Sequence, residues 1–245
     1  MTAGGMLSRP RKSKMEVPAP KEIRFQMNQP EEVLDAKYSS PYEQRRLTIL
    51  RELIPEGQGD AALDLGCGSG IISEMLLSLG WSVTAVDLHP ENVNRAKQKV
   101  AKAIQGDAVS VSRSLEEKAF GFICALELIE HLDEDERVDL LRETRRLARP
   151  GARLLLSTPN KMSPEGLEGY YWGELIRGVP FKAWDNTHQR IYSSFGIRGA
   201  LRRAAWRPLK TMGDYYGGRI SLPLDVSYRF PLNRFGFNTS IVSEA

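Results

Sequence analysis

Short apolar segments recur along the chain, and in the stretches between them apolar residues repeat at helical spacing. The segments at 61–65, 82–88, 120–126 and 152–158 are rich in Leu, Ile, Val and Ala, which is typical of buried strands. A weaker strand is expected within 101–107. Because these segments are apolar on both sides, we expect a sheet that is covered on both faces.

Helical periodicity fills the intervals between these strands. Helices are expected over 43–53 and from Pro90, and Asp133 is expected to cap a third that ends at Pro150-Gly151. The inner face of that third helix should carry Val138, Leu141 and Leu147. A fourth helix follows Gly70, since apolar residues recur at i, i+3, i+4 and i+7: Ile72, Met75, Leu76 and Leu79. Strand and helix thus alternate through Thr158, which predicts an α/β domain with a mostly parallel sheet.

The pattern changes after Pro159. Residues 160–184 are rich in Pro, Gly and aromatic side chains and show no clear periodicity. A long connection of this kind in a compact domain is usually functional, so we assign 160–190 to a substrate lid. A helix is expected over 194–205. Two late strands, 208–212 and 237–242, are expected to close the sheet as an edge hairpin.

Composition is that of an ordinary globular domain. The 245 residues are 41% hydrophobic and 27% charged, enough for one domain with a sizeable core. No apolar run is long enough for a transmembrane helix. The two cysteines, Cys67 and Cys124, lie in apolar segments, which favours free buried thiols in a reducing compartment. Cytoplasmic localisation is therefore predicted.

The net charge of +3 is unevenly distributed. Residues 1–30 combine basic side chains with prolines and are expected to form a disordered basic leader ahead of the folded domain at 31–245. Residues 190–219 are also basic. This second stretch is either a solvated helix face or a surface that attracts an anionic partner.

The segment "LDLGCGSG" follows the first apolar strand and leads into a helix. Glycines at Gly66, Gly68 and Gly70 allow a tight turn and close approach of a ligand, and a helix N-terminus favours negative charge. Asp87 ends the second strand, where a carboxylate can accept both ribose hydroxyls of an adenosine group. The glycine spacing is G-x-G-x-G, which differs from the nicotinamide fingerprint G-x-G-x-x-G.

Together with "VDL", "GDA" and the acidic strand end at Glu127, this loop resembles the motifs of class I S-adenosylmethionine-dependent methyltransferases. The resemblance covers about 63–158. It implies a Rossmann-like fold with a seven-stranded sheet and a lid insertion after the fifth strand. It also implies a set of cofactor-binding residues: Asp64, Gly66, Cys67, Gly68, Asp87, Leu88, Asp107, Ala108 and Leu126.

The segment "ELIEH" at 127–131 comes directly after the fourth strand, at the edge where open α/β sheets bind their ligands. If it coils, Glu127, Glu130 and His131 come within reach of one point. Two carboxylates and an imidazole suit Mg²⁺, with Mn²⁺ or Zn²⁺ as alternatives. A fourth ligand is needed, and His89 and His188 are the remaining histidines.

The E-x-x-E-H segment, "STPN" and the later "DNTH" resemble two metal-dependent branches of the family: ubiquinone-pathway O-methyltransferases and small-RNA 3′-end 2′-O-methyltransferases. The resemblance implies metal ligation by Glu127, Glu130, His131 and His188. "KAWD" stands where the quinone branch has a glycine before Thr-His. Two alternatives stay open: a metal-free site with His131 or His188 as general base, and a purely structural role.

These observations predict an S-adenosylmethionine-dependent O-methyltransferase that acts on a hydroxyl of a small molecule, such as a catechol, phenol or vicinal diol. The cofactor carries the activation, so the protein supplies positioning and removal of the acceptor proton. RNA 3′-end methylation is the first rival, disfavoured by the small net charge. A non-catalytic cofactor-binding protein is the second. The oligomeric state is not predicted.

Overall fold

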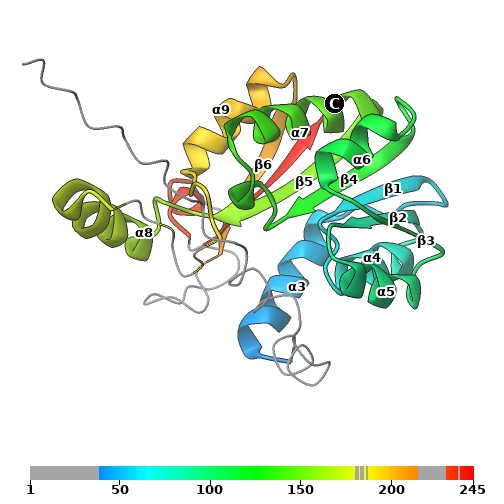
Figure 1. The fold of residues 1–245 in the computed structure, drawn as a ribbon, viewed down its shortest axis with the longest axis horizontal. Helices are drawn as coiled ribbons and strands as arrows, with labels where there is room; N and C mark the ends of the chain where they lie inside the picture. Colours follow the sequence, from blue (N-terminus) through cyan, green and yellow to red (C-terminus); the bar gives the residue numbers. More distant parts are fainter. Residues whose placement is uncertain (1–38, 180–181, 183–184, 186, 215–229, 237) are drawn as a thin grey trace, which may run out of the picture.

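The computed structural model describes residues 39–179, 182, 185, 187–214, 230–236 and 238–245 (Figure 1). The basic leader predicted for 1–30 lies outside the described residues, and so does Phe237, the first residue of the last predicted strand. Among the described residues, none of the helices has the length and apolar character needed to span a bilayer.

A seven-stranded sheet forms the centre of the described structure. Its order is β3-β2-β1-β4-β5-β7-β6, and β7 runs antiparallel to both of its neighbours. The strands are β1 (Ala61–Leu65), β2 (Ser82–Asp87), β3 (Lys102–Gln105), β4 (Phe120–Leu126), β5 (Ala148–Pro159), β6 (Arg207–Asp214) and β7 (Asn238–Glu244). The α/β fold and the closing hairpin are confirmed. The strand order reverses between β1 and β4, and ligands of open α/β sheets bind at such a reversal.

Helices cover both faces of the sheet (Figure 1). One face packs against α3 (Pro41–Leu53), α4 (Ile71–Ser78) and α5 (Pro90–Lys97). The other packs against α6 (Ala108–Ser114), α7 (Glu134–Leu147) and α9 (Ser194–Arg203). Because successive side chains of a strand point to opposite faces, Leu63 and Leu65 join the α6–α7–α9 core while Ala62 joins the other.

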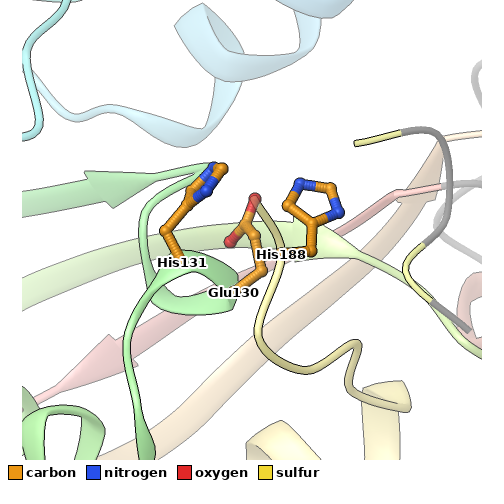
Figure 2. A group of neighbouring side chains, drawn as sticks. All are labelled: Glu130, His131 and His188. Carbon is orange, nitrogen blue, oxygen red and sulfur yellow. The ribbon is translucent and has the colours of Figure 1, made fainter. Parts of the chain in front are cut away.

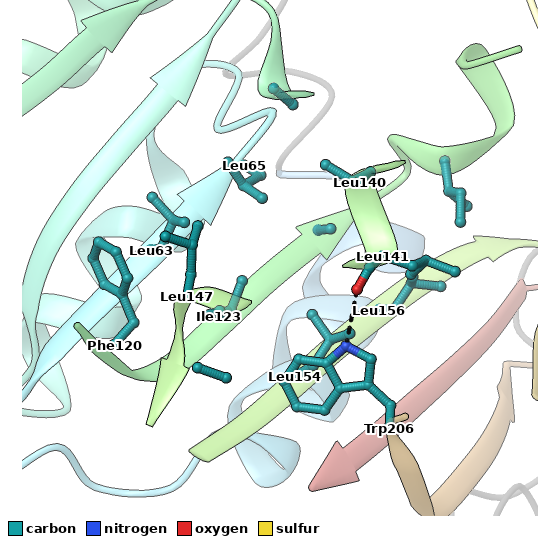
Figure 3. Packing of buried hydrophobic residues seen from close by; sticks show 14 of the residues in the cluster. Leu63, Leu65, Phe120, Ile123, Leu140, Leu141, Leu147, Leu154, Leu156 and Trp206 are labelled. Atoms are coloured by element: carbon teal, nitrogen blue, oxygen red, sulfur yellow. Dashed lines mark hydrogen bonds between the residues drawn. The ribbon is translucent and has the colours of Figure 1, made fainter. Parts of the chain in front are cut away.

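The core on the α7 side is shown in Figure 3, where Leu140 and Leu147 lie against the strands and Trp206 fills the space beside α7. The Trp206 indole N–H donates to the carbonyl of Leu141 at 3.4 Å, so this large ring is buried with its polar atom satisfied. The contact fixes the start of β6 against α7.

Two details of α7 differ from the prediction. The helix ends at Leu147, and Pro150-Gly151 lie inside β5, where the pairing with β4 shifts register between Phe120 and Phe122. Val138 is 38% exposed, whereas Arg137 and Leu140 are buried. Leu141 and Leu147 are buried as predicted, and only Val138 lies off the inner face, where Arg137 is buried instead.

The chain between β5 and α9 contains more regular structure than its sequence suggested. Helix α8 (Pro164–Gly169) continues into a π-helical segment, η2 (Tyr170–Ile176), that has no buried residue. Periodicity is missing because no face of this segment packs on the core. Asn160 pairs with Tyr192, and the Lys161 N–H donates to the Tyr192 carbonyl at 2.8 Å, so the two ends of the connection lie side by side.

Candidate active site

The glycine loop leaves β1 as the sequence predicts. Gly66, Gly68 and Gly70 have φ of +72°, +53° and +80°, values that favour glycine. The backbone N–H groups of Gly66 and Cys67 both donate to the Val86 carbonyl, at 2.8 and 2.9 Å. The loop is therefore tied to the end of β2, beside Asp87.

Asp87 holds this loop through its carboxylate. Oδ2 accepts from the Gly68 N–H at 2.9 Å, and Oδ1 accepts from the His89 N–H at 2.9 Å and from Asn92 Nδ2 at 3.1 Å. Leu88, the next residue, is 56% exposed, which leaves an apolar surface beside the loop. The loop, Asp87 and Leu88 thus lie together, as predicted for a nucleoside site.

Asp64 is buried beneath polar contacts with the protein. Its Oδ2 accepts from Ser73 Oγ at 2.5 Å and its Oδ1 from Cys124 Sγ at 3.2 Å. Burial raises the pKa of Asp64, and Ser73 and Cys124 oppose that rise. Cys67 and Cys124 are both buried free thiols, as predicted, and burial raises the pKa of each. Asp64 therefore ties β1 to α4 and β4.

The remaining predicted cofactor residues lie at strand ends. Asp107 caps α6, a helix that the sequence analysis missed, and its Oδ1 accepts from the Ser110 N–H at 2.8 Å. Ala108 is the first residue of that helix, and Leu126 is the buried last residue of β4. The motif "GDA" thus contains the N-cap of a helix. Asp is one of the preferred N-cap residues, so Asp107 was the available sequence signal for α6.

The backbone turns sharply at Glu127, where φ is +50°. Its side chain is directed toward β5, and Oε1 accepts from Ser157 Oγ at 2.7 Å and lies 3.9 Å from Arg46 Nη2. A short 3₁₀ helix, η1 (Ile129–His131), follows. Glu127 lies before that turn. It is therefore separate from the cluster that contains Glu130 and His131.

Glu130, His131 and His188 form one cluster. Each offers a ligand atom, and these atoms all lie within 4.8 Å of one another. Figure 2 shows the Glu130 carboxylate between the two imidazole rings, whose centroids are 4.8 Å apart. The Glu130 carbonyl accepts N–H bonds from Gln189 and Arg190 at 2.7 and 3.3 Å, which fixes the His188 segment to η1.

Hydrogen bonds assign the proton of each imidazole. His188 Nδ1 lies 2.9 Å from the Lys182 carbonyl, which only accepts, so Nδ1 carries the proton. Thr187 Oγ1 donates to Asp185 Oδ1 at 2.6 Å and lies 2.9 Å from His131 Nδ1, so His131 Nδ1 donates to Thr187. In the neutral form of each ring Nε2 then has the lone pair, which is the form in which histidine binds metals.

Burial shapes the charge of the cluster. It lowers the pKa of His131, with His188 adding to the shift, so His131 is neutral at neutral pH. It raises the pKa of Glu130 well above 4.5, and the neighbouring Glu127 adds to that rise. Glu130 Oε2 accepts from Thr158 Oγ1 at 3.1 Å, while Oε1 is buried without a hydrogen-bond partner. An orphaned carboxylate oxygen beside two imidazole lone pairs fits a divalent cation.

The residues that orient this cluster were not among those predicted from the sequence. Thr158 contacts Glu130, and Thr187 with Asp185 holds His131. Thr158 lies in the segment "STPN" and Thr187 in "DNTH". The hydroxyl residues in these two segments could have indicated which side chains support the candidate ligands. Asn160 of "STPN" is buried, and its Nδ2 donates to the carbonyls of Arg234 and Gly236 at 2.9 and 2.8 Å.

Residues 39–211 match a family model described as a methyltransferase domain. The chain belongs to this methyltransferase family. It is an S-adenosylmethionine-dependent methyltransferase. The glycine loop and Asp87 lie at the carboxyl ends of β1 and β2, the edge at which open α/β sheets bind their ligands. The expected fold and enzyme class are confirmed.

Relatives named ubiquinone biosynthesis O-methyltransferase are similar to part of the chain. The one from Xanthomonas oryzae is 34% identical over 108 residues, covering 42% of this chain and 44% of its own length. The one from Paracidovorax citrulli is 27% identical over 182 residues, covering 71% of this chain and 75% of its own. The chain thus spans less than half the length of the Xanthomonas relative that it matches.

Solved structures with the same fold are more distant in sequence. A methyltransferase from Archaeoglobus fulgidus has a TM-score of 0.65 and 19% identity, and the match covers 87% of this chain and 99% of that one. A possible histamine N-methyltransferase from Thermotoga maritima has a TM-score of 0.62 and 18% identity, covering 81% and 86%. At this identity the likeness establishes the fold alone.

Proposed function

We propose that the protein transfers a methyl group from S-adenosylmethionine to a hydroxyl oxygen of a small molecule, with the Glu130–His131–His188 cluster at the acceptor. The observation that carries this proposal is the cluster itself, with its orphaned oxygen and two free imidazole lone pairs. It follows β4 at the same edge of the sheet from which the cofactor loop leaves β1. The similarity to ubiquinone O-methyltransferases supports a hydroxyl acceptor.

In this proposal Glu130, His131 and His188 hold a divalent metal, with Mg²⁺ preferred and Mn²⁺ or Zn²⁺ as alternatives. A bound divalent ion lowers the pKa of a hydroxyl and orients it. Glu130 supplies negative charge, and Thr187 and the Lys182 carbonyl fix the two rings through Nδ1, which leaves Nε2 of each as the proposed ligand atom. The Glu127 carboxylate accepts from Ser157 and adds negative charge near Glu130. Its role as a fourth ligand stays a prediction.

The cofactor residues position the methyl donor. Asp87 is proposed to accept the ribose hydroxyls, with Leu88 against the adenine, and Gly66, Cys67 and Gly68 are proposed to approach the methionine end. Asp64, which Ser73 and Cys124 hold in place, is proposed to lie at the methionine end as well. Asp107 and Ala108 are proposed to border the adenine, and Leu126 the methyl group.

The connection 160–190 is proposed to cover the substrate. Its described part carries exposed apolar side chains on η2, including Trp172 at 53% and Leu175 at 62%. Its far end delivers His188 to the cluster. A planar acceptor such as a catechol suits such aromatic surroundings.

A metal-free site is the second candidate. Burial keeps His131 neutral, and its Nε2 lone pair is then able to take the proton of the acceptor hydroxyl. Here Glu130 and His188 orient the acceptor, and added metal has no effect on rate.

The two candidates separate in a metal-binding experiment. Mn²⁺ titration followed by electron paramagnetic resonance is expected to show one site in the wild type and weaker binding in His188→Ala. His89→Ala is the matched control, since His89 is a half-buried N-cap of α5 without a side-chain cap bond and lies outside the cluster. Methylation of catechol and vicinal-diol acceptors should stop in EDTA and return with metal. Full activity in EDTA, with equal Mn²⁺ binding by wild type and His188→Ala, would refute the metal site.

A further inference from the structure

A cleft of about 640 Å³ lies between α7 and α9, outside the cluster described above. The two helices are neighbours on one face of the sheet (Figure 1). Apolar side chains such as Leu141, Ile191 and Phe195 line part of it. Its size is that of a small-molecule site.

Cationic side chains dominate the polar lining. Five of them face the cleft, against a single carboxylate, Glu134: Arg137, Arg142, Lys161, Arg190 and Arg203. Glu134 accepts from both Arg137 and Arg190, at 2.7 and 3.0 Å. Among the described residues Arg203 has no carboxylate partner. Lys161 pairs with Glu174 at 2.7 Å, and Arg142 lies 4.0 Å from Asp139. The positive charge left without a matching carboxylate comes from Arg203 and from the two arginines that share Glu134.

Tyr192 lies at the centre of this charge. The guanidinium groups of Arg137 and Arg190 lie 5.3 and 5.6 Å from its ring centroid. Burial raises the pKa of Tyr192, Glu134 adds to that rise, and the charges of Arg137, Arg190 and Arg203 oppose it. Two guanidinium groups therefore lie over one aromatic ring in the wall of the cleft.

Arg137 supplies the second, independent sign of a missing acceptor. It is only 5% exposed, its Nη1 donates to the Leu132 carbonyl at 2.6 Å, and its Nε is buried without a hydrogen-bond partner. A buried guanidinium N–H without an acceptor is costly, and an anion in the cleft would satisfy it.

We propose that this cleft binds a small phosphorylated molecule, with the phosphate among Arg137, Arg190, Arg203 and the Tyr192 hydroxyl. Guanidinium groups match phosphate oxygens in pairs, and the apolar lining accommodates the organic part. Glu134 competes with the phosphate for Arg137 and Arg190. The phosphate therefore displaces the Glu134 carboxylate from Arg137 and Arg190.

The cleft is joined to the candidate active site by one segment. The Arg190 N–H and the Gln189 N–H both donate to the Glu130 carbonyl. An anion that holds the Arg190 side chain therefore steadies the segment that presents His188. Binding itself needs neither S-adenosylmethionine nor a metal.

Pyrophosphate is the probe, titrated by calorimetry at low ionic strength in EDTA without S-adenosylmethionine. Loss of a charge-assisted hydrogen bond predicts about tenfold weaker binding in Arg203→Gln. Glu134→Gln should bind several-fold more tightly. Arg202→Gln is the matched control, because Arg202 lies on the same helix with the same charge and does not line the cleft.

These results are independent of the methylation assay, so either proposal is able to fail alone. No pyrophosphate binding by the wild type overturns the site. So does equal weakening by Arg202→Gln and Arg203→Gln, which indicates general attraction to a basic surface. A single-stranded RNA oligonucleotide that binds more tightly than pyrophosphate, and is weakened equally by both variants, also overturns it and favours a nucleic-acid surface.

Discussion

The Glu130 side chain combines complete burial with an oxygen that has no hydrogen-bond partner. An ionised carboxylate in that position costs stability unless a cation accompanies it. We therefore expect Glu130→Gln to raise the free energy of unfolding of the metal-free protein at pH 7, by on the order of 1–3 kcal/mol. Chemical denaturation in EDTA measures this, and Mn²⁺ binding by the same variant should be lost.

The stabilisation by Glu130→Gln should depend on pH with a defined sign. The pKa of Glu130 is raised in the folded protein, so the wild type is favoured below the ordinary value of 4.5 and loses stability as pH rises above it. The difference between variant and wild type should thus shrink toward zero near pH 4. A difference that is the same at pH 4 and pH 7 would contradict the burial argument.

Thr187 is the hydroxyl that fixes the His131 tautomer. Removal of such a partner from a metal-binding histidine typically reduces metal affinity by about 10–100-fold. We expect Thr187→Val to weaken Mn²⁺ binding by that factor, measured by the same resonance titration. Thr187→Ser keeps the hydroxyl and should stay close to the wild type.

Asp87 is the residue on which the nucleoside site depends. Asp87→Ala should weaken S-adenosylmethionine binding by about 1–3 kcal/mol in calorimetry, through loss of charge-assisted hydrogen bonds. It also frees the Gly68 N–H, which the carboxylate holds at 2.9 Å. Asn92→Ala removes one outer partner of Asp87 and should weaken binding much less. Unchanged affinity in Asp87→Ala would count against the assigned cofactor site.

At the scale of elements, the sheet was predictable and its surroundings less so. β1, β2 and β4 are buried on both faces, and such strands leave an unmistakable apolar run. Helix α6 was missed because "AVSVSRS" has serines at its turns, and its signal lies in the Asp107 cap. His188 lies beside Glu130 although a long connection separates them in the sequence. The family resemblance predicted this contact, and local hydrophobic periodicity carries no information about it.

The divergence of Glu127 from the cluster is also an element-scale effect. The expected i, i+3, i+4 relation required a helix from Glu127 onward. The backbone is left-handed at that residue, and η1 begins at Ile129. A non-glycine residue with positive φ is uncommon, so sequence pattern had no means of indicating it.

Helices α8 and η2 bury almost none of their side chains against the rest of the described structure. The η2 segment has no buried residue, and α8 has Gly166 alone. We expect backbone amides of 164–176 to exchange with solvent much faster than those of β1 and β4 in the protein without ligand. Hydrogen exchange with mass spectrometry tests this. Equal protection of both regions would argue against a covering role for the connection.

At the scale of the whole molecule, β7 is the strand that makes the sheet continuous. It pairs with β5 from Arg153 to Pro159 and with β6 from Arg207 to Asp214. Removal of 238–245 should therefore expose two strand edges and abolish cooperative unfolding, with aggregation of the product. Circular dichroism during thermal unfolding and light scattering report this outcome. A soluble, cooperatively unfolding product would show that β7 is dispensable for the fold.

The paired ends of the connection between β5 and α9 have an evolutionary consequence. Asn160 and Tyr192 lie side by side, and Asn160 also holds the Ser194 N–H at 3.2 Å, so the loop begins and ends on a fixed base. Loops of this construction accept insertions and replacements at small entropic cost. The part of the connection ahead of Lys182, Asp185 and Thr187, such as 161–179, can therefore be exchanged to admit new acceptors while the cluster keeps its supports.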